Sequence, residues 1–160
     1  MFRVTRAEEQ AVRLTMRLAL FGGQMTLGEL AAVEALPEPT VAKLLNLLRR
    51  GGVVEALRGR RGGYVLAGRP QDISTGRVIR SVSGAVVFGY PCHDADSPPD
   101  CPRTEDCGLR PVWKLIESRV AGVLEQTSIA DLLQSEASSG RQVQGLWPIL
   151  GDRAEDPAGD

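Results

Sequence analysis

The chain has few of the residues that mark several common classes of protein. Only 4% of its 160 residues are aromatic, so its core must consist mostly of Leu, Val and Ala, which favours helices. No apolar run approaches the roughly 18 residues of a membrane-spanning helix, and the opening MFRVTRAEEQ lacks the apolar segment of a secretory signal. These absences predict a cytoplasmic protein with no membrane partner.

Residues typical of catalysis are equally scarce. The sequence has a single histidine, no nucleotide-binding loop, and no nucleophile with a paired base, so we expect that the protein is not an enzyme. A small metalloenzyme or electron carrier is the competing class, and nothing in the sequence supports it. The three cysteines are an odd number and cannot all pair within one chain; in the cytoplasm they would stay reduced.

Charge is divided unevenly along the chain. Residues 1–80 carry 13 Lys and Arg against 7 Asp and Glu, whereas residues 81–160 carry 6 against 13. The first half is therefore suited to a polyanionic partner and the second half would repel one. A solvated charged surface is the plainer explanation.

The first fifty residues have the pattern of a helix-turn-helix. Apolar residues recur at steps of three and four over 5–21, and a second short helix follows Thr26, which forms a capping box with Glu29. That helix is expected to stop near Leu36, and a third one runs from Pro39 to Arg50. Its outer side carries residue types that contact bases and phosphates in a major groove: Pro39, Thr40, Lys43, Asn46 and Arg50. Plain packing explains a helix-turn-helix equally well, and a protein-interaction module is the corresponding alternative.

A hairpin follows directly. Short strands are predicted at 53–57 and 64–66, joined by a glycine-rich turn that holds Arg58, Arg60 and Arg61. Arginines at such a tip are free to hold phosphates or enter a minor groove, although a solubilising turn is the alternative. Placed behind a helix-turn-helix, the hairpin predicts a winged helix. Residues 72–83 suggest one more short helix.

All three cysteines and the only histidine of the chain lie in one segment, 89–110. It contains Cys92, His93, Cys101 and Cys107 among four prolines and five acidic residues, and is too polar to pack a core. Such a loop predicts a metal or redox site. The candidates are an iron–sulfur cluster on the thiolates, a zinc ion on three cysteines and His93, and a thiol redox sensor.

The chain after the loop predicts a helix for self-association. Apolar residues at steps of one, three and four run through 109–125, which favours pairing with a second copy in a homodimer over packing on the same domain. A short helix at 129–133 begins at Thr127 or Ser128. From residue 135 the chain turns polar and predicts a mobile tail, with one apolar island, LWPIL at 146–150, of unassigned role.

Over residues 1–133 the chain resembles the Rrf-two family of bacterial transcription regulators, in particular its iron–sulfur members of the IscR and NsrR type. The stretches that carry the resemblance are VTRAEEQAVRLTMRLAL, TLGELAAVEALPEPTVAKLLNLLRRGGVVEALRG, RRGGYVLA, DISTGRVIRSV, and CGLRPVWKLI after the cysteine loop. The resemblance implies a mainly α fold with a small β-hairpin wing. It divides the chain into a winged helix-turn-helix DNA-binding domain (1–83), a cluster-binding loop (84–108), a dimerisation helix with a short terminal helix (109–134) and a tail (135–160). It further implies a homodimer that binds a palindromic operator in double-stranded DNA, usually as a repressor.

The resemblance also implies how a cluster would be held. The three cysteines are its ligands, and in the IscR-like branch a histidine stands where this chain has Arg110, which cannot coordinate iron. In the NsrR-like branch a carboxylate from the first helix of the partner subunit completes the site, and Glu9 occupies that position, with Glu8 next to it. We therefore expect Glu9 in trans, with His93 as second choice, and a 4Fe-4S cluster in preference to a 2Fe-2S cluster; an ordinary exposed glutamate is the plainer interpretation of Glu9. Operator binding would then depend on the cluster and report iron–sulfur status, nitric oxide or redox stress. A cluster-free regulator that uses thiols or zinc is the alternative.

Overall fold

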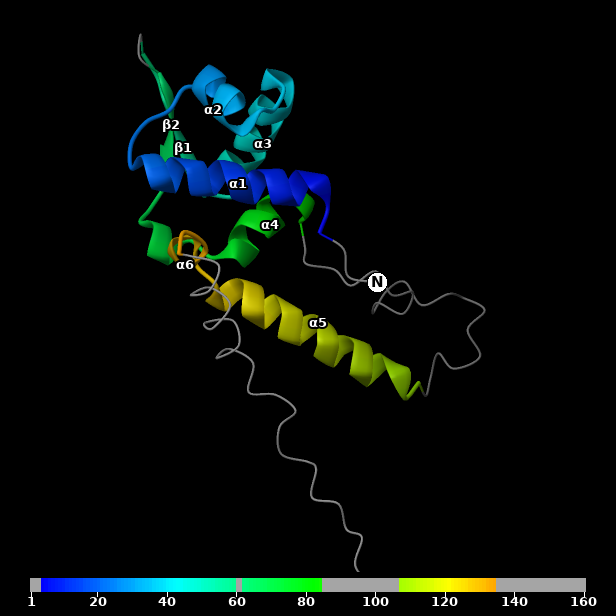
Figure 1. Cartoon of the computed structure of the whole chain (residues 1–160). Coiled ribbons are helices and arrows are strands. Elements are labelled where there is room, and N and C mark those ends of the chain that lie inside the picture. The colour runs from blue at the N-terminus through cyan, green and yellow to red at the C-terminus, as the bar shows by residue number, and fades with distance from the viewer. Residues whose placement is uncertain (1–3, 60–61, 85–106, 135–160) are drawn as a thin grey trace, which may run out of the picture.

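The computed structural model describes residues 4–59, 62–84 and 107–134 (Figure 1). Its elements are α1 (Arg6–Phe21), α2 (Leu27–Glu34), α3 (Glu38–Arg50), β1 (Val54–Leu57), β2 (Gly63–Leu66), the 3-10 turn η1 (Pro70–Asp72), α4 (Thr75–Ser83), α5 (Leu109–Gln126) and α6 (Ile129–Leu132). The expected fold class, mainly α with a β-hairpin wing, is confirmed. Several predicted site residues lie outside the described residues: Arg60, Arg61, Cys92, His93 and Cys101. The tail from residue 135 lies outside them as well.

Three of the helices begin with the same reciprocal cap. In each, a hydroxyl accepts the backbone N–H three residues on, and the carboxylate at that position accepts the N–H of the capping residue. The pairs are Thr5 with Glu8, Thr26 with Glu29, and Ser128 with Asp131. These local pairs therefore determine where α1, α2 and α6 start.

The turn between α2 and α3 begins two residues and ends one residue earlier than predicted. Helix α2 ends at Glu34, two residues before the predicted stop at Leu36, because Ala35 adopts a left-handed conformation with φ 52°. The N–H of Leu36 then donates to the carbonyl of Ala31, which closes the helix end in a Schellman-type arrangement. Pro37 comes next and caps α3, so the two helices are joined by only three residues.

The wing is a two-stranded antiparallel hairpin, in which Val54 pairs with Leu66 and Leu57 pairs with Gly63. A second attachment joins it to the loop before α2: the N–H of Met25 donates to the carbonyl of Tyr64 at 3.0 Å, and the N–H of Tyr64 donates back at 2.8 Å. The wing and the helix-turn-helix therefore form one connected unit.

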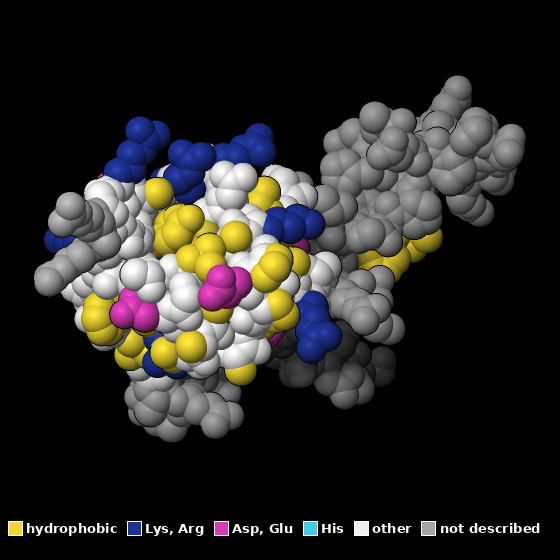
Figure 2. Space-filling model, turned by 90° about the horizontal axis from the view of Figure 1, so that it is seen from above, with side chains coloured by type: hydrophobic (Ala, Val, Ile, Leu, Met, Phe, Trp, Pro, Cys, Tyr) yellow, Lys and Arg dark blue, Asp and Glu magenta, His cyan; other side chains and the backbone are white. Residues whose placement is uncertain are grey.

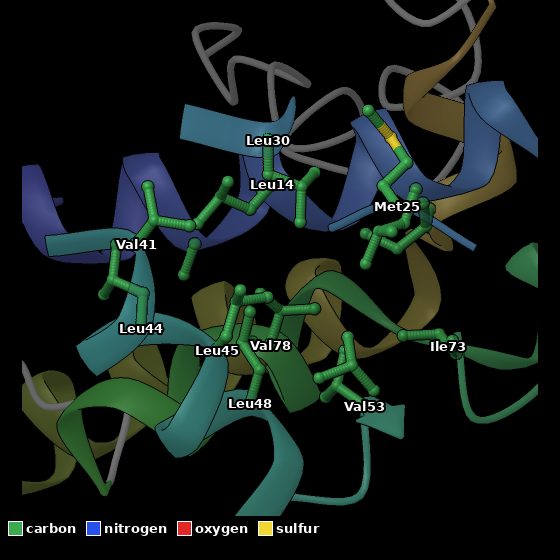
Figure 3. Packing of buried hydrophobic residues seen from close by; sticks show 14 of the residues in the cluster. Leu14, Met25, Leu30, Val41, Leu44, Leu45, Leu48, Val53, Ile73 and Val78 are labelled. Carbon is green, nitrogen blue, oxygen red and sulfur yellow. The ribbon is translucent and has the colours of Figure 1, made fainter. Parts of the chain in front are cut away.

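The core lies between α1, α3 and α4, with α2, β1 and α6 closing its sides (Figure 3). Its labelled members include Leu14 of α1, Leu45 and Leu48 of α3, and Val78 of α4. The helix predicted over 72–83 begins later, at Thr75. Pro70 starts a 3-10 turn, and Ser74 caps α4 by accepting the N–H of Arg77.

Helix α5 is attached to the rest of the chain by its C-terminal end (Figure 1). Glu125 forms an ion pair with Arg80 and accepts a hydrogen bond from Ser74 at 2.9 Å, and the carbonyl of Thr127 accepts the N–H of Thr75 at 2.8 Å. No residue of α5 is buried, and Leu109 and Leu115 are 61% and 55% exposed. In the described part of the chain no helix is long and apolar enough to cross a bilayer.

Candidate functional site

The outer face of α3 is the first candidate surface. Val41, Leu44, Leu45 and Leu48 are buried on the inner face of this helix. The five residues predicted for the opposite side are placed there: Pro39, Lys43, Asn46 and Arg50 are exposed, and Thr40 is half-buried. They recur along successive turns, so the structure brings them into one row.

The charges in this row are available to an external partner. Neither Lys43 nor Arg50 forms an ion pair with any residue that the structure describes. Arg49, which the sequence interpretation did not single out, is also exposed and its Nη2 donates to Oδ1 of Asn46 at 3.4 Å. Figure 2 shows Lys and Arg side chains along one edge of the face that carries α2. Cations without internal partners are suited to phosphate groups.

The wing supplies the second part of this surface. Arg58 follows β1 directly and is exposed, and Arg60 and Arg61 of the same turn lie outside the described residues. Gly59 has φ 128°, a backbone conformation that residues with a Cβ rarely adopt. Its carbonyl accepts the N–H of Gly62 at 2.9 Å. Gly59 and Gly62 are thus close together in space on either side of the two arginines.

Of the predicted cysteine ligands, the structure describes only Cys107. This thiol is half-buried immediately before α5, and the carbonyl of Cys107 accepts the N–H of Arg110 at 3.2 Å. Cys92, Cys101 and His93 lie outside the described ranges, and within those ranges no group of three His, Cys, Asp or Glu side chains could hold a metal. The ligand set therefore stays a prediction.

The two neighbouring glutamates of α1 have different surroundings. Glu8 is buried and its carboxylate accepts the N–H of Thr5 at 2.6 Å. Burial alone would raise the pKa of Glu8, but hydrogen bonds from Thr5 and Ser83 outweigh it and hold that pKa below its usual value. The side chain of Glu9 is 50% exposed, and its nearest ionic partner is Arg13 at 3.4 Å. Glu8 is committed to the helix cap, whereas Glu9 is accessible to a ligand.

An ion-pair cluster that the sequence did not reveal joins α1 to the end of α2. Glu34 is buried, and its carboxylate accepts hydrogen bonds from Arg13 at 3.0 Å and Arg17 at 2.7 Å; Arg13 also donates to the carbonyl of Glu34. The hydrogen bond to Glu34 raises the pKa of the Arg13 guanidinium above its usual range. The partners lie 21 and 17 positions apart, so no local pattern could have identified them. Arg13 contacts both Glu9 and Glu34.

A second set of contacts runs through α4. The guanidinium of Arg77 donates to the carbonyls of Gly51 at 3.2 Å and Gly52 at 2.8 Å, the two residues that directly follow α3. A cation is favourable at the C-terminal end of a helix, where the dipole is negative. One turn later, Arg80 pairs with Glu125 of α5. Helix α4 therefore contacts both the end of α3 and the end of α5.

Comparison with known proteins agrees with this arrangement. The profile of the Rrf2 family, described as an iron-dependent transcriptional regulator, matches residues 4–135. The transcriptional repressor NsrR of Streptomyces coelicolor is 32% identical over 147 residues, which cover 90% of this chain and 95% of that protein.

Two solved structures have the same fold. IscR of T. potens has a TM-score of 0.63 and 28% identity, covering 82% of this chain and 85% of its own. CymR, the global cysteine regulator of B. subtilis, also has a TM-score of 0.63, with 29% identity over 82% of this chain and 96% of its own. With a winged helix, a row of exposed polar and basic residues on α3 and a family match over residues 4–135, the chain belongs to the Rrf2, or Rrf-two, family of DNA-binding transcriptional regulators.

Proposed function

We propose that the protein is a homodimeric repressor that binds a palindromic operator through α3 and the wing. The observation that carries this proposal is the row of exposed polar and basic residues on α3, opposite a fully buried stripe. A helix of this kind enters a major groove, where Lys43 and Arg50 contact phosphates and Asn46 is suited to an adenine edge. The wing arginines then contact the adjacent backbone or minor groove.

Dimerisation is supported by the apolar surface of α5. Val112, Trp113 and Leu115 are 49%, 36% and 55% exposed in the protomer, a larger apolar surface than a solvated helix normally presents. A second α5 would cover it. The chain is then divided into a DNA-binding unit (1–83), a sensor loop (84–108) and a dimerisation unit (109–134). In such a dimer each α3 meets one half-site, and half-sites lie about 34–36 Å apart.

We further propose that the sensor loop holds an iron–sulfur cluster, 4Fe-4S in preference to 2Fe-2S. Thiolates are the usual ligands of such clusters, and Cys92, Cys101 and Cys107 supply three. Glu9 of the partner subunit is the proposed fourth ligand, because its carboxylate is accessible whereas that of Glu8 is used in the cap of α1. When bound, the cluster supplies an iron centre that nitric oxide, oxygen or iron scarcity can damage.

The contacts of the chain provide two routes from the sensor loop to α3. Glu9 is linked through Arg13 to Glu34, at the end of α2 where the chain turns into α3. Helix α5, which begins just after Cys107, is linked through Glu125 and Arg80 to α4, whose Arg77 holds the other end of α3. A change at either ligand would move the element that positions the DNA-reading residues.

One comparison favours an alternative chemistry. CymR is named the global cysteine regulator and not an iron regulator, so membership of the family does not by itself imply iron. A cluster-free regulator that uses thiols or zinc is the second candidate. Anaerobic purification separates the two, since an iron–sulfur protein absorbs near 400 nm and contains iron and sulfide in equal amounts.

The proposal is tested by operator binding of the cluster-bound and the cluster-free protein. Fluorescence anisotropy with duplex DNA from the promoter of its own operon is expected to give a clearly weaker affinity for the cluster-free form. Equal affinities would refute control by the cluster but leave DNA binding standing. Failure to bind any duplex more tightly than random DNA would refute the role of α3.

The origin of the fourth ligand is tested with mixed dimers. One protomer carries Glu9→Ala and the other carries Cys101→Ser, with different affinity tags. If Glu9 is donated in trans, the mixed dimer retains one complete site and half of the wild-type cluster, whereas both parent homodimers lose it. A mixed dimer with no more cluster than the Glu9→Ala homodimer would place the ligand in the same subunit or elsewhere.

A further inference from the structure

An apolar groove lies where the end of α1 meets α2, away from the row on α3. It encloses about 410 Å³ and is lined by Arg17, Leu20, Phe21, Met25, Glu29 and Val33. Leu20 and Phe21 are 60% and 61% exposed, and Val33 is 51% exposed. Figure 2 shows hydrophobic side chains at the centre of the face that carries α2. Exposed apolar side chains gathered in a groove mark a surface that binds an apolar partner.

The sequence contains a segment of matching chemistry. Residues 146–150, LWPIL, are the only apolar run in the polar stretch 135–160 and lie outside the described residues. Trp147 and its neighbours offer one large ring and several branched side chains. A proline in the run disfavours a helix and leaves an extended segment suited to a shallow groove. The residues on both sides of the run are polar and can stay in solvent, so the run can bind to a surface groove without forming a hydrophobic core of its own.

The chain is long enough for this contact. Helix α6 packs against α1, and α1 has 16 residues, so it is about 24 Å long. Every point on α1 is therefore within roughly 35 Å of α6 once the width of a helix is added. The 11 residues between Gln134 and Leu146 extend up to about 40 Å. The connecting chain is therefore long enough for the apolar run to reach the groove within its own protomer.

The acidic end of the chain gives the contact a consequence. Residues 151–160 carry four acidic side chains, Asp152, Glu155, Asp156 and Asp160, against one basic side chain. Helix α2, which contributes Glu29 and Val33 to the groove, packs against α3, and the ten residues 151–160 extend up to about 36 Å, so a chain anchored in the groove is long enough to bring its acidic part to the cations of α3. Carboxylates in that place compete with DNA phosphates.

We propose that residues 146–150 dock in the groove between α1 and α2 of the same chain and that residues 151–160 then shield the DNA-reading cations of α3. The shielding rests on the proposed function, whereas the docking does not. The tail would weaken binding to random DNA more than binding to the operator, because non-specific binding depends almost entirely on phosphate contacts.

Docking is tested by the fluorescence of Trp147 in the full chain. Trp113→Phe leaves Trp147 as the only tryptophan, and a docked indole emits at shorter wavelength than a solvated one. Phe21→Ser, a change at an exposed position, is expected to shift that emission to longer wavelength, whereas the control Val4→Ser, exposed by 47% at the other end of α1, leaves it unchanged. If Trp147 already emits like a solvated indole in the Trp113→Phe protein, whose groove is unchanged, the proposal is overturned.

Shielding is tested by DNA binding at low salt. Trp147→Ala and the triple variant Asp152→Asn, Glu155→Gln and Asp156→Asn are each expected to bind random DNA about three- to tenfold more tightly, an advantage that disappears at high salt. The triple variant keeps the short-wavelength emission, because its apolar run is intact. Arg141→Ala is the matched change outside the run and leaves both readouts unaltered.

The outcomes separate this inference from the proposed function. A protein that binds its operator but shows no effect of Trp147→Ala or of the triple variant refutes the shielding alone. A protein that binds no operator refutes the proposed function, while the emission still reports the docking. If Phe21→Ser dissociates the dimer, the groove is an interface between copies and the proposal is overturned.

Discussion

The close approach between α3 and α4 makes Gly51→Ala a sharp test of how α3 is held. A Cβ built on Gly51 would lie 2.6 Å from Cβ of Ser81 and 3.4 Å from its Cα, and closer still to its hydroxyl. Carbon atoms in ordinary contact are about 3.5–4.0 Å apart, so the two helices must separate by roughly 1 Å. The backbone of Gly51 itself tolerates alanine, since its φ is −78°.

The size of the effect follows from this overlap. Forcing one extra methyl into a packed contact costs about 1–3 kcal/mol, which lowers the melting temperature of a chain of this length by roughly 2–12 °C. Separation would also lengthen the hydrogen bonds from Arg77 to the carbonyls of Gly51 and Gly52. We therefore expect weaker operator binding even at temperatures where the variant stays folded.

Thermal unfolding by circular dichroism, at one fixed protein concentration, measures the loss. Gly68→Ala is the matched control, because a Cβ at that position meets no atom within 4 Å. Ser81→Gly placed in the Gly51→Ala background removes the obstructing side chain and should restore most of the melting temperature. A Gly51→Ala protein as stable as the Gly68→Ala protein would refute the close packing of α3 on α4.

Four further predictions address other parts of the molecule. Lys43→Ala should reduce the slope of log affinity against log salt by about 1 for every duplex, as measured by anisotropy, whereas Arg69→Ala, at the turn that packs on α6, should leave it unchanged. Glu34→Gln removes the carboxylate charge and replaces one of the two acceptor oxygens by an amide donor that faces an arginine, and it should lower the unfolding free energy in urea by about 1–3 kcal/mol; an unchanged midpoint would contradict a stabilising role of the ion pairs with Arg13 and Arg17. Backbone hydrogen bonding to Thr26 holds the pKa of Glu29 below its ordinary value, so its stabilisation is complete at neutral pH and is lost as the pH falls through the folded-state pKa. The difference in melting temperature between the wild type and Glu29→Gln should therefore shrink towards about pH 3, and a difference that grew would have the wrong sign. Cys101→Ser should abolish absorption near 400 nm while gel filtration still gives a dimer, and a monomeric or unfolded variant would show that the loop is structural.

Local patterns predicted the elements of this fold because its helices carry their own start signals. The hydroxyl of Thr26 and the carboxylate of Glu29 sit three positions apart, and the structure shows both hydrogen bonds of the capping box. The outward row of α3 followed from the same periodicity that buried Leu44 and Leu48. The start of α4 was misplaced by three residues, because Asp72 belongs to a 3-10 turn and Ser74 supplies the cap.

Contacts between distant residues could not be predicted in the same way. Nothing near Glu34 in the sequence indicates that two arginines of α1 enclose it, since the pairing depends on how α2 packs on α1. The ion pair of Arg80 with Glu125 spans 45 positions and depends on the packing of α5 on α4. The choice between Glu8 and Glu9 needed the structure for the same reason, because only the burial of Glu8 shows that it is already occupied.

The attachment of α5 at its far end also bears on how such regulators diversify. The chain connects α4 to α5 through residues 84–108, yet the two helices are held together by Glu125, Thr127 and their partners on α4, at the opposite end of α5 from that connection. The alignment of the two helices therefore does not depend on the connecting segment. Insertions, deletions and exchanges of donor atoms within it can accumulate while the scaffold keeps its geometry. The same scaffold can thus respond to new chemical signals through changes in a single segment, which suits a family that is described as iron-dependent and includes a regulator named for cysteine.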